Sequence, residues 1–142
     1  MYIPKHFRPE ELVPPAVFSE RGDLCLTLID ERVLRTLDRL RDSFGIITIN
    51  DWLWGGNFTE SGLRVPDSDC YSCYSQHTFG RAMDCKMKYI DAESARQSII
   101  KSKALFPFIS FLETDIDWLH FDVRNCQRIQ LWSPKTKQST FV

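Results

Sequence analysis

An amphipathic stripe that leads directly into a β-branched run is the feature that most limits how this chain can fold. The stripe carries apolar residues at spacings of four, three and four: Val33, Leu37, Leu40 and Phe44. This spacing predicts a helix that starts at Asp30 and stops at Gly45. Residues 46–52 follow at once and are rich in β-branched side chains, so they predict a buried strand.

Short apolar runs in the second half of the chain predict the rest of the sheet. Four further strands are expected, at residues 82–87, 108–112, 118–123 and 129–132. Asp91 can cap one more helix, which runs through Ala95 and Ile99. Because strands that suit antiparallel pairing stand apart from the helices, the sequence predicts an α+β fold with a mainly antiparallel sheet and two or three helices.

The length of the chain suits one domain. With 142 residues, 43% of them hydrophobic, residues 1–142 are expected to form a single unit around one core. Residues 1–27 hold four of the seven prolines, which predicts an extended arm with little regular structure. Four apolar side chains would anchor this arm on the body: Phe7, Leu12, Val17 and Phe18.

The charge balance argues against two classes of partner. The chain has 18 Lys and Arg residues and 19 Asp and Glu residues, a formal net charge of −1, with no basic run longer than two. Nucleic acids and membrane surfaces bind to a concentrated basic face, so neither is an expected partner. The longest apolar stretch, 105–112, is far shorter than the roughly 20 residues that cross a bilayer, so no membrane insertion is expected.

The N-terminal sequence and the cysteine count indicate a reducing compartment. Residues 1–10 lack the continuous apolar core of a secretory signal, so we expect synthesis in the cytoplasm without a signal peptide. Five cysteines are an odd number, which suits reduced thiols better than a disulfide framework. Cys70 and Cys73 form a lone Cys-x-x-Cys, which could also bind a structural metal with Cys85 or Cys126, or act as a redox pair.

Two of the three histidines lie in polar contexts that can bind a metal ion. His77 precedes Asp84 by seven residues, with a glycine between them, and His120 is flanked by Asp117 and Asp122. Two imidazoles and one carboxylate are a common ligand set for catalytic zinc, whose fourth position stays open for water. Hydrogen-bonded structural histidines and turn aspartates fit the same spacing, so both interpretations stay open. Asp122 shares a strand face with His120 and is expected to orient its imidazole.

The combined pattern resembles the zinc signature of a peptidase family. Two motifs of this chain are similar to the signature of the D-Ala-D-Ala carboxypeptidases, metallopeptidase family fifteen: Ser75-x-His77-x-x-Gly80-x-Ala82-x-Asp84 and Trp118-Leu-His120-Phe-Asp122. That family shares a fold with the hedgehog signalling domain and includes small phage cell-wall peptidases. Upstream segments extend the resemblance to about residues 5–125: His6-Phe7 with Glu10-Glu11, Leu37-x-x-Leu40-Arg41, and Ser61-Gly-Leu-Arg64, where the family's Ser-Gly-Tyr-Arg has a tyrosine in place of Leu63.

The resemblance implies roles for individual residues. It makes His77, Asp84 and His120 the ligands of one zinc ion. Arg64 would correspond to the arginine that stabilises the developing oxyanion. Ser75 would face the substrate or brace the loop that carries the first histidine.

The resemblance leaves two carboxylates as candidates for the general base. Asp117 stands three residues before His120, where family members with Glu-x-x-His carry their base, and it is the preferred candidate. In a regular strand this separation puts the two side chains on opposite faces, so Asp117 needs a turn or a bulge before Trp118. Glu113, seven residues before His120, is the competitor.

Hydrolysis of peptide bonds in bacterial peptidoglycan, in stem or cross-link peptides, is the activity that the resemblance implies. The chain is expected to be a zinc hydrolase of the carboxypeptidase or endopeptidase type, a monomer, and a phage or prophage cell-wall lysin. It would reach the wall after lysis, through a holin-type pore or as part of a virion. The alternative is a non-catalytic relative of the same fold: a zinc-stabilised binding or virion structural domain.

Overall fold

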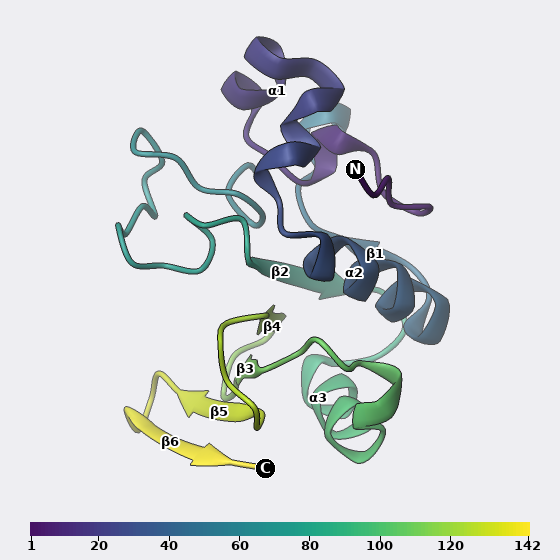
Figure 1. Ribbon diagram of the computed structural model, residues 1–142, viewed down its shortest axis with the longest axis vertical. Helices are drawn as coiled ribbons and strands as arrows, with labels where there is room; N and C mark the ends of the chain where they lie inside the picture. The colour runs from purple at the N-terminus through teal and green to yellow at the C-terminus, as the bar shows by residue number, and fades with distance from the viewer.

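Six strands form one sheet in the computed structural model, which describes residues 1–142 (Figure 1). The strands are β1 (Ile47–Thr48), β2 (Ala82–Met87), β3 (Phe111–Glu113), β4 (Leu119–Asp122), β5 (Gln130–Ser133) and β6 (Gln138–Phe141). They lie in the order β1-β2-β4-β3-β5-β6, and every neighbouring pair is antiparallel except β3 and β5, which are parallel. Three helices accompany the sheet: α1 (Pro15–Arg21), α2 (Glu31–Phe44) and α3 (Ala92–Lys101). The α+β class with a mainly antiparallel sheet is confirmed.

The helix ends follow the capping residues that the sequence offers. The Asp30 side chain accepts a hydrogen bond from the backbone N–H of Arg32 at the start of α2, and Gly45 ends this helix with a φ of 81°. Asp91 caps α3 in the same way, by accepting from the backbone N–H of Ser94. Both predicted helices are confirmed, and α2 turns its apolar stripe into the core.

The sheet differs from the sequence prediction at its two ends and at β3, which begins at Phe111 and not at residue 108. β2 coincides with the predicted range 82–87, whereas β1 keeps only two residues of the predicted strand. The chain leaves the sheet there because the Asn50 amide bonds to the Val13 carbonyl and to the backbone N–H of Ser61. The sequence does not predict β6, because its four residues are all exposed and show no alternation of apolar and polar side chains.

Residues 1–27 are not the extended arm that their prolines predict. The segment forms α1 and two 3-10 turns, η1 (Pro9–Glu11) and η2 (Gly22–Leu28). Proline favours this arrangement, because Pro15 occupies the first position of α1, where no N–H group needs a partner. The anchoring side chains are confirmed: Phe7, Leu12 and Val17 are buried, and Phe18 packs against the core.

Alternation along β2 and β4 gives the centre of the sheet one apolar face and one polar face. Four residues of these strands belong to the core that α2 and α3 complete: Met83, Cys85, Leu119 and Phe121. Asp84, His120 and Asp122 alternate with them and therefore point to the other side of the sheet.

None of the three helices combines the length and the apolarity that a membrane span requires.

A buried carboxylate on α2 fastens the first residues of the chain. Asp38 is 4% exposed and accepts hydrogen bonds from the Tyr2 hydroxyl at 2.6 Å and from the backbone N–H groups of Lys5 and His6. Asp42, one turn further along the helix, contacts only the His6 ring and stays largely in solvent. Asp38 therefore holds the first residues of the chain against α2.

Replacing Asp38 by asparagine should lower the free energy of unfolding by about 1–3 kcal/mol, because the amide cannot accept all of these bonds and leaves a buried donor without a partner. Urea denaturation would measure the loss. Asp42→Asn is the matched control and should change stability by less than about 0.5 kcal/mol, since it removes one exposed contact. Equal losses in the two variants would contradict the role given to Asp38.

Candidate metal centre

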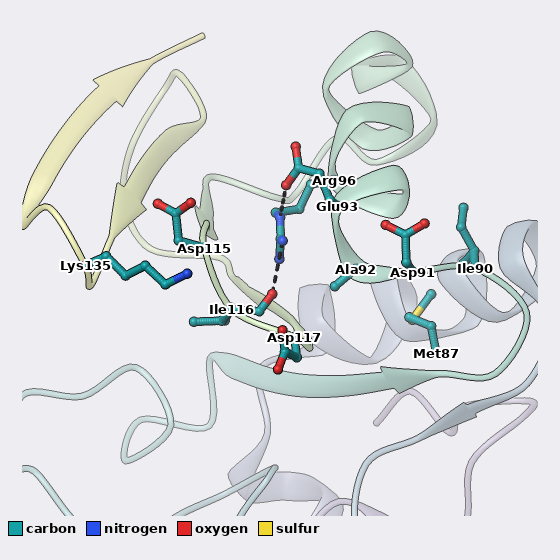
Figure 2. A pocket seen from close by; sticks show the side chains of 10 residues that line it. All are labelled: Met87, Ile90, Asp91, Ala92, Glu93, Arg96, Asp115, Ile116, Asp117 and Lys135. Carbon is teal, nitrogen blue, oxygen red and sulfur yellow. Dashed lines mark hydrogen bonds and ion pairs between the residues drawn. The ribbon is translucent and has the colours of Figure 1, made fainter.

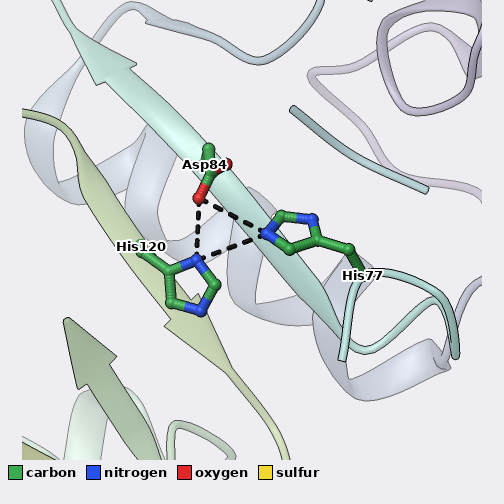
Figure 3. Close-up of side chains that lie close together, drawn as sticks. All are labelled: His77, Asp84 and His120. Carbon is green, nitrogen blue, oxygen red and sulfur yellow. Dashed lines mark hydrogen bonds and ion pairs between the residues drawn. The ribbon is translucent and has the colours of Figure 1, made fainter. Parts of the chain in front are cut away.

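Three buried side chains converge on one point beside the sheet (Figure 3). His77 Nε2 lies 3.3 Å from His120 Nδ1 and 3.5 Å from Asp84 Oδ1, and these last two atoms are 2.7 Å apart. The exposed fractions are 2% for His77 and 9% for both Asp84 and His120. The chain thus brings together the three residues that the sequence suggested as ligands.

Strand register and one tight turn produce this geometry. Asp84 and His120 are directly paired in the antiparallel ladder between β2 and β4, so their side chains share one face. His77 lies in the loop before β2, and the chain turns into the strand at Gly80, whose φ is 65°. A Cβ atom at Gly80 would lie 2.0 Å from the carbonyl oxygen of Leu28, so this path requires glycine.

The donor atoms suit a divalent metal ion. His77 Nδ1 donates to the carbonyl oxygen of Gly62 at 2.7 Å, which leaves the lone pair of Nε2 directed at the other two side chains. Ligands about 2.0–2.1 Å from a tetrahedral ion lie roughly 3.3 Å from one another. Two of the three donor separations are close to this value. The buried group can therefore hold a metal ion and leave a further coordination position open.

The charges in the group are one ionised carboxylate, one neutral imidazole and one imidazole that favours its proton. Burial lowers the pKa of His77. Burial also opposes ionisation of Asp84, but the hydrogen bond from His120 and the positive charge that His120 favours outweigh it and hold the pKa of this carboxyl well below its usual range. Burial opposes a charge on His120 as well, but Asp122 and Asp84 overcome it and raise the pKa of His120 to about 9.

The Ser-Gly-Leu-Arg segment holds two of the three ligands. The Ser61 carbonyl accepts the backbone N–H of Asp84, and the Gly62 carbonyl accepts from the ring of His77. Arg64 donates from Nη2 to Asp84 Oδ2 at 2.9 Å, which leaves Oδ1 for the histidines. The backbone N–H of Arg64 donates to the His77 carbonyl. This motif therefore positions ligands as well as placing a guanidinium beside them.

Ser75 and Asp122 support the two histidines from outside the group. Ser75 Oγ accepts the backbone N–H of His77 at 3.3 Å, so Ser75 braces the loop. Asp122 is fully buried, and its Oδ2 lies 3.8 Å from His120 Nε2. Arg124 Nε donates to both carboxylate oxygens of Asp122 and fixes its orientation. Asp122 thus lies where strand alternation predicts, against the ring nitrogen of His120 that faces away from the group.

Glu113 is the candidate base that the structure brings to the ligands. It ends β3, which pairs with β4, and its Oε2 lies 4.0 Å from His120 Nδ1. Its side chain is 19% exposed, and burial raises its pKa. If the group held a metal ion, a carboxyl group this close to a ligand nitrogen would be placed to accept a proton there.

Asp117, the preferred base in the sequence interpretation, lies elsewhere. It is exposed and lines a separate pocket with Asp115 and Arg96 (Figure 2). Arg96 fixes this turn by donating to the carbonyl oxygens of Ile116 and Trp118. Asp117 lies in the bend before β4 and not on the strand, and this bend directs it to the pocket beside Arg96 and not to the ligands.

The cysteines take no part in the group. Cys25 and Cys85 are buried in the core, Cys70 and Cys73 are exposed, and all five cysteines are free thiols. The His77-Asp84-His120 group is the one place where three potential ligands meet, and no cysteine belongs to it. The structure therefore gives no support to a structural metal site built on the Cys-x-x-Cys motif.

Two residues beside the group, Phe111 and Arg124, were not identified from the sequence. Phe111 meets the His120 ring edge-on, with ring centroids 5.7 Å apart, and the Arg124 guanidinium lies 3.7 Å from the centre of the Phe111 ring. Strand alternation could have found Phe111, because it stands two residues before Glu113 on the same face of β3. No local sequence signal marks Arg124.

Comparisons of the chain with protein-family models, with curated proteins and with solved structures gave no match. The site itself provides three donors for a metal ion, one carboxylate near a ligand nitrogen and one guanidinium on the outer oxygen of Asp84. Together these groups can hold an ion, move a proton and offer positive charge to an anion.

A methyl group at Gly62 should displace the segment that holds His77 and Asp84. An added Cβ atom would lie 2.1 Å from the Leu12 carbonyl oxygen, and a backbone atom cannot move aside cheaply. We expect Gly62→Ala to weaken Zn²⁺ binding by about tenfold or more, as changes behind metal ligands do. Competition with a chromophoric chelator would measure this affinity.

Gly22→Ala is the control for the loss of a glycine. Its φ is 53° and its added Cβ atom would meet no other atom, so it should lower stability without changing the affinity for Zn²⁺. Unchanged affinity in Gly62→Ala would contradict the positioning role of the segment.

Binding of Zn²⁺ should release one proton at neutral pH. In the metal-free protein His120 stays protonated up to a pKa of about 9, whereas a ligand imidazole must be neutral. His77 is already neutral and Asp84 already ionised there. The affinity for Zn²⁺ should therefore rise about tenfold per pH unit from roughly pH 7 and level off above the pKa of His120. Calorimetry in buffers of different ionisation enthalpy would count the proton, and a count of zero would contradict this charge assignment.

Proposed function

We propose that this chain is a zinc-dependent peptidase that hydrolyses peptide bonds in bacterial peptidoglycan, in stem or cross-link peptides. The observation that carries the proposal is the position of Glu113 beside the buried His77-Asp84-His120 group. Two imidazoles and one carboxylate with an open position are a donor set of catalytic zinc sites. A zinc ion held there would supply Lewis acidity to the scissile carbonyl and lower the pKa of water.

Glu113 acts first as the general base and then as the general acid. It takes one proton from the attacking water, whose oxygen bonds to the carbonyl carbon, and gives that proton to the amide nitrogen as the C–N bond breaks. The products are a carboxylic acid and an amine, and Glu113 returns to its ionised form. Its raised pKa suits this cycle, because a stronger base takes the proton from water more readily.

Arg64 offers positive charge to the carbonyl oxygen. Its Nη2 is held by Asp84 and its Nε by the Glu60 carbonyl at 2.8 Å, while Nη1 makes no hydrogen bond. A guanidinium that is already fixed can favour the negative charge that develops on that oxygen without reorganising. Arg64 therefore both positions a ligand and stabilises the oxyanion.

The choice of peptidoglycan, and of a phage or prophage lysin, is supported by the similarity of the two histidine motifs to the wall-peptidase signature. A pocket of about 200 Å³ lies beside Arg64, the residue proposed to stabilise the oxyanion. It is lined by residues 57–61, Arg64, Cys70 and Asp84. Backbone and polar side chains in this lining suit a peptide substrate. Such a lysin would act on the wall after lysis, through a holin-type pore or from a virion.

A non-catalytic, zinc-stabilised binding or virion domain is the second candidate. The observation that favours it is the burial of all three ligands, together with the ion pair between Arg64 and Asp84, because structural zinc sites are closed by their surroundings. Both candidate functions require the zinc ion, but only the peptidase requires Glu113 to transfer a proton.

Zinc content and peptide release, measured on the same samples, separate these candidates. The wild type should bind one zinc ion per chain and release new amino groups from purified peptidoglycan. His77→Ala and His120→Ala should lose both properties. Glu113→Gln should keep the zinc and lose about 10²–10⁴-fold in rate, because it removes the proton carrier alone.

Asp117→Asn is the matched control, since it changes an exposed carboxylate near the same strand and should keep both zinc and activity. Zinc without hydrolysis in the wild type would favour the binding domain. Full activity in Glu113→Gln would overturn the role of Glu113, and absence of zinc from the wild type would overturn the metal centre.

A further inference from the structure

A second hollow lies on the same side of the sheet as the ligands, beyond β3. Its volume is about 380 Å³, and it is lined by Phe111, Arg124, Gln130, Trp132 and Ser139. The register of the parallel pair explains the lining: Phe111 stands beside Gln130, and Glu113 stands beside Trp132. The proposed proton carrier and this hollow therefore occupy neighbouring positions on one face.

Two contacts join the hollow to the metal centre. The Phe111 ring meets the His120 ring edge-on, and the Arg124 guanidinium stacks on the Phe111 ring at 3.7 Å. Arg124 also pairs with Asp122, which lies against the outer nitrogen of His120. A molecule in the hollow would thus touch the wall of the metal centre without displacing a ligand.

Residues that line the hollow carry hydrogen-bonding groups that no protein atom uses. Arg124 spends Nε and Nη2 on Asp122, which leaves Nη1 free, and its side chain is 33% exposed. Trp132 Nε1 makes no hydrogen bond. Gln130 donates from Nε2 to Ser139 Oγ at 2.9 Å, so its carbonyl oxygen is free to accept. Two N–H donors, one of them on a guanidinium, are the chemistry that binds a carboxylate.

The position of Glu113 sets the direction of the substrate. A proton passes only over hydrogen-bond distance, so the leaving amine must lie beside the Glu113 carboxylate. Arg64 and its pocket lie at β2, and the strand order β2-β4-β3-β5 places the hollow on the far side of Glu113. The residue that carries the leaving amine therefore continues toward β5.

We infer that this hollow is a subsite for the leaving-group residue and that it recognises a carboxylate on that residue. The inference rests on the proposed peptidase function for its direction and on Arg124, Trp132 and Gln130 for its chemistry. The carboxylate can be the free end of the peptide chain or an acidic side chain, which are two sources of the same group. Arg124 binds it, and Trp132 packs against the residue that bears it.

Binding of small carboxylates to the zinc-loaded protein tests the subsite without hydrolysis. The readout is the indole N–H resonance of Trp132, identified by its absence from Trp132→Phe. N-acetyl-alanine should bind at least about tenfold more tightly than N-acetyl-alanine amide if the chain end is recognised. The α-amide of N-acetyl-glutamate should show the same preference over that of N-acetyl-glutamine if a side chain is recognised.

Variants separate the subsite from the metal. Arg124→Gln, compared at equal zinc content, should abolish the preference for acid over amide, and Gln130→Ala, which touches no ligand, should weaken probe binding. Trp54→Phe is the control, because this exposed tryptophan lies outside the hollow. Equal binding of acid and amide in both probe pairs would overturn the subsite even if peptidoglycan is cleaved. A preference that survives in a protein without hydrolysis would support the subsite and overturn only the peptidase.

Discussion

The pairing of β2 with β4 is the constraint on which the rest of the molecule depends. Its register sets Asp84 directly opposite His120, and the period of two then sends the neighbours of both residues into the core. A shift of one residue in either strand would turn its potential ligand toward the apolar core and its apolar side chains toward the polar face of the sheet. The hydrophobic core and the candidate metal centre therefore lie on the two faces of the same ladder.

The N-terminal segment and the Ser-Gly-Leu-Arg segment position His77, which lies outside the ladder of β2 and β4. The Leu12 carbonyl accepts the backbone N–H of Leu63, and the carbonyl of Gly62 in turn receives the ring of His77. Two hydrogen bonds thus connect Leu12, near the start of the chain, to His77 through the Ser-Gly-Leu-Arg segment. Glycine is needed at the point of closest approach, where any side chain would meet the Leu12 carbonyl.

Local patterns predict the parts of this structure that local forces decide. The stripe of α2, its cap at Asp30 and the run 82–87 are visible in the sequence because helix and strand periods are properties of neighbouring residues. The arm interpretation of residues 1–27 is wrong because prolines interrupt helices yet also begin them, and only the tertiary context separates the two roles. β6 carries no apolar period, since pairing with β5 alone holds it.

The two ends of the sheet have a consequence for how the molecule behaves among copies of itself. One edge strand, β1, is two residues long, and the other, β6, carries the exposed polar residues Gln138, Ser139 and Thr140. Lys135 and Lys137 stand in the turn that leads into it. Short edges and nearby lysines are the means by which sheets resist the addition of further strands. At high local concentration, the open edges of this sheet are poor templates for aggregation.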